Sequence, residues 1–542
     1  MFKIEKRKYI LCLAYLTMFI FINYLGYMLN KNLGLIYNKI PSIFIIVLMM
    51  SSILSIIICK IIDNIHFEFK ELKCKINSKN RFFIFFLLGF ISYIPALLAY
   101  YPSIWSYDIT TQIDQIMNSG YTRYHPLLHT FLIDVCIQLG DRLFNSYTFG
   151  ALIYSLIQMT ILSMSIAYAI NYIINNFKIN RITLLALMVF YLLMPFNAIM
   201  AISTTKDTIF AALTIILFVK TFDILYYKKN SIKQYIEYLI IIILWFSFRN
   251  NAYFAFLAFA VISVFILWSK KLKIIFLCTI IICTNLIFNA CLDKALDADT
   301  ISSAEVIAVP GSQIAMAAIR SPDKIIDSQW YDIEIIFGDN YRYYNPYLFD
   351  TIKTRINFQA SEMKKLLVLW ATILPNCLTD YIDSFMLLNS GSWYILDKSH
   401  TRVYIDKYFD LELTTGNLVD RHQGYLQTDN AKVLDINFQH YLNGAYDYYE
   451  GICSLNRGHN NPITAVFLSP GIYLWIVILC LFVAIYKKDK NLSIPLILLI
   501  LYWFTTLLGP CTLFRYMYPV IICTPICLCL SFSKRRDVVN EK

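Results

Sequence analysis

A succession of long apolar runs restricts the fold of this chain more than any other feature. Hydrophobic residues make up 58% of the 542 residues and charged residues only 15%. Most runs are close to the roughly 20 residues that a helix needs to cross a bilayer. The sequence therefore predicts an all-α polytopic membrane protein with about twelve transmembrane helices. The expected spans are 9–29, 41–62, 82–100, 147–170, 182–200, 207–225, 236–248, 252–268, 274–290, 464–486, 491–508 and 512–532.

Two of these runs, 236–248 and 252–268, are short and meet at Arg249, Asn250 and Asn251. They are either two full crossings or the halves of a broken or re-entrant pair, since broken helices occur at membrane depth where they line a cavity. The number of spans stays open at this point.

Clusters of Lys and Arg between the runs predict the orientation, because short cytoplasmic loops hold the excess of basic residues. If all clusters face the cytoplasm, this is a multi-pass cell-membrane protein with both termini cytoplasmic, and 101–146 and 292–463 lie outside. The net charge of +11 then reflects topology, and no nucleic-acid partner is expected. The clusters surround Lys6, Lys75, Arg181, Lys228, Lys271, Lys488 and Arg535.

Three parts follow from this topology. Residues 1–291 form an N-terminal transmembrane block, in which the outer loop 101–146 carries the predicted catalytic site. Residues 292–463 form a mixed extracytoplasmic domain of short amphipathic stretches and aromatic-rich loops. Residues 464–542 form a C-terminal transmembrane block with a basic cytoplasmic tail. Of the 14 cysteines, Cys377 and Cys453 share the outer domain, but two cysteines alone are a weak indication of a disulfide.

The loop from Tyr100 to Thr130 is unusually polar for its surroundings. On a helix, Asp108, Gln112 and Gln115 share one face, because they are spaced at i, i+4 and i+7. We expect a short amphipathic helix in the membrane interface, with its polar face toward an outward cavity. The alternative is that Asp108 only caps this helix.

Two histidines follow in the same loop. His125 precedes Pro126, which suits the start of a helix, and His129 comes four residues later. Such a pair can share a divalent cation or bind an anion. No third metal ligand has an obvious spacing, so two interfacial histidines without a metal are the other interpretation. No cofactor beyond this candidate cation is predicted.

Cations also occur at the predicted outer ends of three later spans, where the charge bias of membrane proteins disfavours them. Lys206 and Asp207 lie in one outer turn, Arg249 lies at the tip of the short helix pair, and Arg515 and Tyr516 begin the last span. Individually, Lys206 and Arg515 can be snorkelling side chains, and Arg249 can pair with a buried acid.

Together these residues predict a reaction on a membrane-bound phosphate ester. Cations would hold the phosphate and stabilise the charge on it as it leaves. The Asp108 carboxylate would take the proton from an incoming hydroxyl. A phosphate leaving group hardly needs a general acid, so a single carboxylate suffices.

The chain resembles the GT-C glycosyltransferases, such as protein mannosyltransferases and aminoarabinose transferases. The resemblance rests on Tyr107-Asp108, on His125-Pro126-Leu127-Leu128 and on the stretch from Arg515 to Pro519, with Leu127 replacing the second proline of the family's HPP-like element. It implies transfer of a sugar from a polyprenyl-phosphate-linked donor, within membrane lipid, to an extracytoplasmic glycan, lipid or protein.

The chain also resembles an uncharacterised family of bacterial multi-span proteins. The shared patterns are YPxxxSYDxxxQ, HPxLHT and the segment from Pro375 to Tyr394. Carried over from the GT-C resemblance, Asp108 is the catalytic base. The implied substrate-binding residues are Gln112, His125, His129, Lys206, Asp207, Arg249, Arg515 and Tyr516.

Two other functions compete with this interpretation. A flippase or transporter of lipid-linked saccharides also suits about twelve spans and a broken helix pair. A polysaccharide polymerase or ligase likewise uses outer arginines on lipid diphosphates.

Overall fold

The computed structural model describes residues 5–64, 71–72, 76–105, 107–226, 231–299, 307–353, 355–356, 358–397, 436–453 and 466–536. Within these ranges the chain is helical apart from two strands of two residues each. The helices of the N-terminal half are α1 (Lys6–Asn32), η1 (Tyr37–Lys39), α2 (Ile40–Asn64), α3 (Ser78–Ala99), α4 (Tyr107–Asp114), η2 (Gln115–Ser119), α5 (Leu127–Phe144), α6 (Tyr147–Asn176), α7 (Arg181–Met188), η3 (Val189–Leu193), α8 (Pro195–Ile202), α9 (Lys206–Tyr226), α10 (Ile232–Phe248), α11 (Ala252–Ile266), η4 (Trp268–Lys270) and α12 (Lys271–Leu296).

The second half of the chain contains shorter helices and then three apolar ones. The shorter helices are α13 (Ala308–Arg320), η6 (Pro322–Lys324), α14 (Asp327–Phe337), η7 (Gly338–Tyr343), α15 (Asp350–Lys353), η8 (Ala360–Glu362), α16 (Met363–Ile373), α17 (Leu378–Leu388), α18 (Ser390–Trp393) and α21 (Asn443–Cys453). The apolar helices are α24 (Pro470–Tyr486), α25 (Lys490–Thr506) and α26 (Phe514–Phe532).

Several helices are long and apolar enough to cross a membrane, as an all-α membrane protein requires. Among the described residues, seven helices qualify by length and composition, or eight if the bent pair Arg181–Leu193 and Pro195–Ile202 is one span. That pair bends by 45° at Met194, directly before Pro195. The helices α11, α24 and α25 are apolar but shorter. The chain is therefore a multi-pass membrane protein, while the count of twelve spans stays a prediction.

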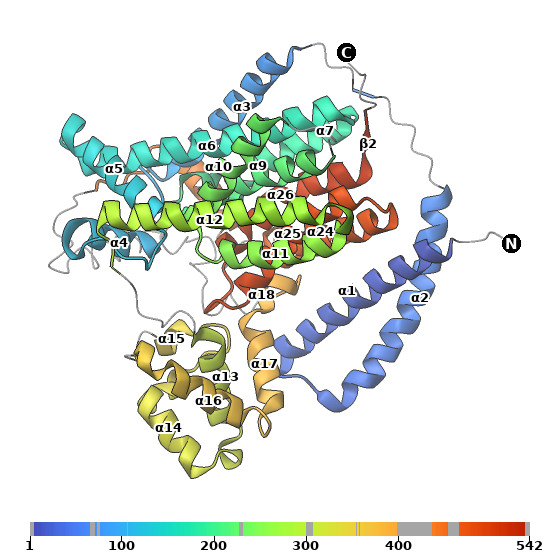
Figure 1. Ribbon diagram of the computed structural model, residues 1–542, viewed down its shortest axis with the longest axis vertical. Coiled ribbons are helices and arrows are strands. Elements are labelled where there is room, and N and C mark those ends of the chain that lie inside the picture. The colour runs from blue at the N-terminus through green and yellow to red at the C-terminus, as the bar shows by residue number, and fades with distance from the viewer. Residues whose placement is uncertain are drawn as a thin grey trace.

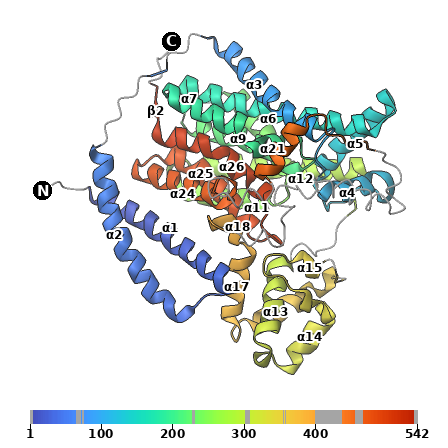
Figure 2. The ribbon, with the colours of Figure 1, turned by 180° about the vertical axis from the view of Figure 1, so that it is seen from behind.

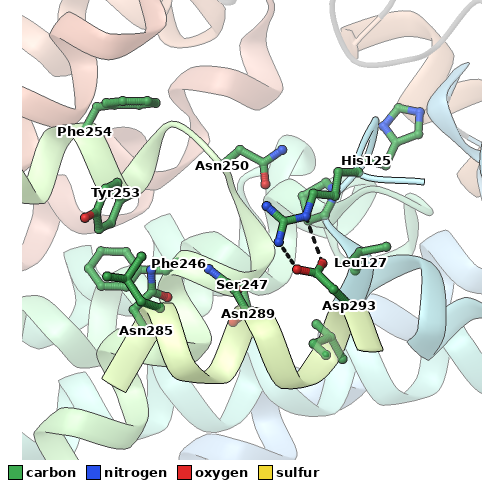
Figure 3. Close-up of a pocket in the computed structure, with 14 residues that line it drawn as sticks. His125, Leu127, Phe246, Ser247, Asn250, Tyr253, Phe254, Asn285, Asn289 and Asp293 are labelled. Carbon is green, nitrogen blue, oxygen red and sulfur yellow. Dashed lines mark hydrogen bonds and ion pairs between the residues drawn. The ribbon is translucent and has the colours of Figure 1, made fainter. Parts of the chain in front are cut away.

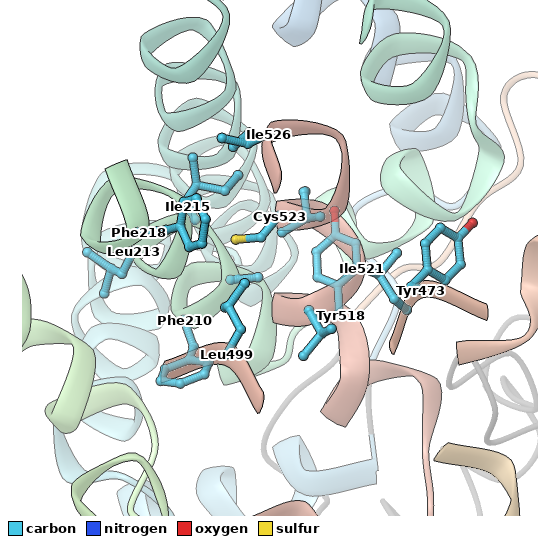
Figure 4. Packing of buried hydrophobic residues seen from close by; sticks show 14 of the residues in the cluster. Phe210, Leu213, Ile215, Phe218, Tyr473, Leu499, Tyr518, Ile521, Cys523 and Ile526 are labelled. Atoms are coloured by element: carbon cyan, nitrogen blue, oxygen red, sulfur yellow. The ribbon is translucent and has the colours of Figure 1, made fainter. Parts of the chain in front are cut away.

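The main bundle is centred on α9 and α26, which are almost entirely buried by their neighbours. Figure 4 shows how Phe210 and Phe218 of α9 pack beside Tyr518, Cys523 and Ile526 of α26. The helices α1 and α2 form a hairpin at one side of the main bundle (Figure 1), where α1 packs on α24, with the rings of Phe19 and Trp475 5.2 Å apart. Because lipid provides little hydrophobic driving force between helices, the close side-chain packing around α9 and α26 fixes their arrangement.

Several of the basic clusters lie at one end of this bundle, in the part of the chain that the structure describes. The C-terminal strand β2 (Lys534–Arg535) pairs antiparallel with β1 (Phe177–Lys178), which follows α6. The side chain of Lys490 donates to the carbonyl of Ile266 at 3.2 Å. The strand β2 lies on this side of the bundle, and α4 lies at the opposite end (Figures 1 and 2).

Helices α13 to α17 enclose a small hydrophobic core of their own, which includes Ile314, Ile333 and Leu369. This helical unit lies beside the α4 end of the bundle (Figure 2). A backbone hydrogen bond of 2.9 Å from Phe349 to Pro510 joins it to the segment that precedes α26.

The predicted outer domain, 292–463, divides between two places in the described residues. Helices α13 to α17 form the unit above, whereas α21 packs on α3 and α8 of the main bundle, and Gln439 pairs with Tyr101. The thiol of Cys377 is buried and free. The side chain of Cys453 and the whole segment 398–435 lie outside the described residues, as does Ser106 of the YPxxxSYDxxxQ pattern.

Candidate functional site

Backbone pairing places Asp108 beside Lys206, although nearly a hundred residues separate them. The amide of Ile104 donates to the carbonyl of Ile202 at 3.0 Å, and the carbonyl of Ile104 accepts from the amide of Thr204 at 2.8 Å. The fully buried amide of Gln158 on α6 supports the same turn, donating to the carbonyls of Met200, Ala201 and Ser203 at 2.6 to 3.1 Å. The α8–α9 turn and the start of α4 are therefore fixed against each other.

Asp108 forms a bidentate ion pair with Arg515, and Lys206 joins it. The guanidinium of Arg515 donates to both carboxylate oxygens of Asp108, at 2.8 and 3.1 Å. The Lys206 ammonium donates to Oδ2 of Asp108 at 2.8 Å. Both Asp108 and Lys206 keep part of their side chains exposed, 16% and 15%, whereas Arg515 keeps 4%. The accessible edge of this cluster thus consists of the carboxylate and the ammonium.

A second layer of charge lies beneath this edge. Asp207 is completely buried and forms ion pairs with both Arg249 and Arg515. The Tyr516 ring lies against the same two cations, with its centroid 4.7 Å from Arg249 Cζ and 5.1 Å from Arg515 Cζ. Thr205 accepts from Arg515 at 3.3 Å and donates to Asp207 at 3.0 Å. The alternative that Arg249 pairs with a buried acid is therefore confirmed, and that acid is Asp207.

The electrostatics of the loop follow from these partners. Burial raises the pKa of Asp108, but attraction from Arg515 and Lys206 outweighs this effect and holds the pKa well below its usual range. Burial and then repulsion from Lys206 lower the pKa of His125 to about 3. At neutral pH Asp108 is a carboxylate and His125 is an uncharged imidazole.

The predicted helix after Asp108 is present as α4 and η2, but it does not turn a polar face toward a cavity. Gln112 is buried and donates to the hydroxyl of Thr130 at 2.9 Å, and its amide lies 2.8 Å from Nδ1 of His129. Gln115 is also buried and donates to Thr122 at 2.8 Å. Ile109 and Ile113 are buried on the other side, so both the glutamine face and the isoleucine face of the helix pack against the protein.

The two histidines occupy different environments. His129 is buried on α5, and its Nε2 lies 2.8 Å from the hydroxyl of Tyr154. His125 lies before α5, with Nδ1 3.3 Å from Lys206 Nζ and 4.0 Å from Asp108 Oδ2. Among the described residues no group of three His, Cys, Asp or Glu side chains is arranged to hold a metal ion. Of the pair, only His125 adjoins the charged cluster.

A cavity of about 350 Å³ opens on the other side of His125. It lies between the start of α5, the α10–α11 turn and α12 (Figure 3). Two polar residues of its lining, Asn285 and Asn289, were not among the site residues predicted from the sequence. The signal was available, because amides one helical turn apart inside an apolar run are uncommon and often functional.

Comparison with known proteins adds a family but no activity. Neither the curated proteins nor the solved structures contain a match to this chain. The family match covers residues 117–542 and so includes His125, Lys206, Asp207, Arg249 and Arg515, whereas Asp108 precedes it. Over that span, more than half of its length, the sequence fits the model of a family of unknown function, DUF6020, and the chain belongs to this family.

Proposed function

We propose that this protein is an integral membrane glycosyltransferase that moves a sugar from a polyprenyl-phosphate-linked donor to an extracytoplasmic glycan, lipid or protein. The observation that carries the proposal is the partly exposed carboxylate of Asp108, held between the ammonium of Lys206 and the guanidinium of Arg515. A candidate base and one candidate phosphate-binding cation thereby share the partly exposed edge, and a second cation, Arg515, lies buried beside them. The neighbouring cavity is lined by His125, which adjoins this cluster.

The charge of the cluster supports a singly charged ligand. Lys206, Arg249 and Arg515 contribute three positive charges, and Asp108 and Asp207 contribute two negative ones, so these five residues sum to +1. A sugar joined to a lipid through one phosphate is a phosphodiester with one negative charge. Its binding would neutralise the cluster, which favours it over an uncharged ligand at this position.

The proposed reaction is a single displacement. The oxygen of an acceptor hydroxyl forms a bond to the anomeric carbon of the donor sugar. The bond from that carbon to the phosphate oxygen breaks, and its electron pair stays on the lipid phosphate, whose charge Lys206 and Arg515 stabilise. The hydroxyl proton goes to the Asp108 carboxylate.

Donor binding would also make Asp108 a stronger base. Without a ligand, Lys206 and Arg515 both donate to Asp108 and lower its pKa. A bound phosphate competes for the same donors, so the carboxylate loses part of that stabilisation and its pKa rises. Arg249 and Asp207 lie deeper, and their proposed role is to position Arg515 and Tyr516.

The topology belongs to the proposal as well. About twelve spans, cytoplasmic termini and an extracytoplasmic position for α13 to α17 would place Asp108 at the outer surface of the cell membrane. Two observations support this orientation: several of the basic clusters lie at one end of the bundle, and α4, whose first turn contains Asp108, lies at the other. A site at one end of the helices favours an enzyme over a transporter, whose site lies near the bilayer midplane.

The test is sugar transfer in proteoliposomes loaded with polyprenyl-phosphate hexoses. We predict that Asp108→Asn abolishes transfer while the protein still folds and inserts, because the amide cannot accept the proton. The matched control is Asp114→Asn on the same helix, since the Asp114 carboxylate accepts a hydrogen bond from Asn118 instead. Near-normal transfer by the Asp108→Asn variant would remove Asp108 from the mechanism.

A further inference from the structure

The cavity beside His125 differs in character from the charged cluster that it adjoins. Its polar lining consists mainly of uncharged groups, namely the side chains of Ser247, Asn250, Asn285 and Asn289. Figure 3 shows Asn285, Asn289 and Asp293 along one side of α12. The only full charges in the lining, those of Arg123 and Asp293, neutralise each other in an ion pair. The cavity therefore offers hydrogen bonds without net charge.

Two buried polar atoms in this lining lack a hydrogen-bond partner among the described residues. They are Oδ1 of Asn285, whose residue is 3% exposed, and Nε2 of His125. A buried amide or imidazole without a partner costs free energy, and such groups in native proteins usually have a ligand, an ion or water as partner. Both atoms can be satisfied by a ligand in the cavity.

One flank of the cavity is apolar and uncovered. Phe254 on α11 and Leu286 on α12 line the cavity and are 64% and 57% exposed. The helix α12 is long and apolar enough to cross a membrane, so an exposed Leu286 side chain on it faces lipid, and Phe254 of the shorter apolar helix α11 adjoins the same cavity. The cavity thus has amide side chains in its lining and an exposed apolar flank that suits acyl or isoprenyl chains.

We propose that this cavity binds an uncharged saccharide headgroup carried on a lipid chain. Hydroxyl groups of a sugar both donate and accept, which matches amide side chains and a neutral imidazole. A phosphate would find no net positive charge here. The assignment rests on the proposed function, and it names the substrate class: either the sugar of the lipid-linked donor or that of a lipid-anchored acceptor.

His125 connects the two sites. One ring nitrogen lies 4.0 Å from the Asp108 carboxylate, and the residue also lines the cavity. A sugar that fills the cavity would therefore contact a residue that itself adjoins the charged cluster. That proximity is what transfer requires, because the reacting hydroxyl and the phosphate must meet at Asp108.

The test measures lipid binding to the full-length protein by native mass spectrometry. The probes are diacylglycerols that carry glucose, galactose or mannose, with plain diacylglycerol as the reference. We predict that the protein prefers at least one hexosyl lipid, and that Asn289→Leu lowers this preference about tenfold, as expected for loss of one or two hydrogen bonds. Asn285→Leu is the second cavity variant. Thr279→Leu is the control, because Thr279 is exposed on the same helix and does not line the cavity.

Two further probes identify the source of the sugar and separate this inference from the proposed function. They are undecaprenyl phosphate with and without a bound hexose. If Asn289→Leu weakens only the hexose-bearing form, the cavity holds the donor sugar. If it weakens only the hexosyl diacylglycerols, the cavity holds an acceptor. No preference for any hexosyl lipid in the unmodified protein, or an unchanged preference in both asparagine variants, would overturn the inference. Unchanged binding of bare undecaprenyl phosphate by Arg515→Gln would instead contradict the proposed function.

Discussion

At the scale of single residues, Asp207 determines how three cations can share one site. Its carboxylate has no exposed surface and pairs with Arg249 and Arg515, which are themselves buried. Removing one partner from such a group leaves a buried charge uncompensated, which costs far more than an exposed ion pair contributes.

We therefore predict that Asp207→Asn destabilises the protein by about 3 to 5 kcal/mol, through the unpaired guanidinium groups. Thermal unfolding of the purified variant in detergent measures this change. Asp339→Asn is the control, since the Asp339 side chain is 86% exposed and pairs with Arg342 three residues later. Equal melting temperatures for the two variants would argue that Asp207 is not the counter-ion of the site.

The sequence was informative about the charged residues and less so about the polar ones. Lys206, Arg249 and Arg515 stood out because they violate the charge bias of membrane proteins, and the structure brings them together around two carboxylates. Helical spacing placed Gln112 on the face of Asp108, but periodicity does not reveal what covers a face. The partners of Gln112, namely His129 and Thr130, come from the next helix and required the fold.

At the scale of elements, the α8–α9 turn positions the site. It carries Thr205, Lys206 and Asp207, and three carbonyl groups at its start accept hydrogen bonds from one buried side chain, Gln158 of α6. Because α6 packs on both α8 and α9, this side chain connects the turn to the rigid part of the bundle.

We predict that Gln158→Leu lowers the free energy of unfolding by about 1 to 3 kcal/mol, because the buried carbonyl groups of Met200, Ala201 and Ser203 lose their hydrogen bonds from Gln158. Sugar transfer should fall as well, since Lys206 is no longer held beside Asp108. Melting temperature and transfer are measured together. The control is Gln138→Leu, an exposed glutamine of α5 that donates to Asp134. A Gln158→Leu variant as stable and active as this control would contradict the assigned role of the turn.

The helices themselves follow from hydropathy, whereas their interruptions do not. Each apolar run expected to span the membrane overlaps one helix or the bent α7–α8 segment over most of its length, although five runs extend beyond the ends of their helices. The short pair that meets at Arg249 is present as α10 and α11. The π-helical turns η2 and η3 have no comparable signature in the sequence, because they depend on how neighbouring helices pack.

At the scale of the whole molecule, the basic loops lie at one end and the candidate site lies at the other. This separation predicts which parts are accessible from outside the cell. We expect an epitope tag inserted after Arg342, in the helical unit near the site, to bind antibody on intact cells. A tag fused to the C-terminus should bind only after permeabilisation. The same epitope in both positions makes each the control for the other, and the reverse pattern would place Asp108 on the cytoplasmic side.

The sequence could not predict which distant segments pack against each other. The segment 292–463 reads as one outer domain, because it is a long stretch between apolar blocks. The structure divides its described part: α13 to α17 have their own core, and α21 packs on α3 and α8. Gln439, four residues before α21, pairs with Tyr101, two residues after α3. Sequence patterns do not reveal such a contact, because the two residues lie far apart in the chain.

The proposed roles of Asp108, Lys206 and Arg515 are tested most directly by a structure of the protein in nanodiscs with a polyprenyl-phosphate hexose bound. We predict that Lys206 and Arg515 lie within about 3 Å of the phosphate oxygens. The Asp108 carboxylate should then have lost at least one of its bonds to these cations, and should face the anomeric carbon of the sugar. A phosphate bound elsewhere, with Asp108, Lys206 and Arg515 still joined as in the unliganded protein, would contradict the account.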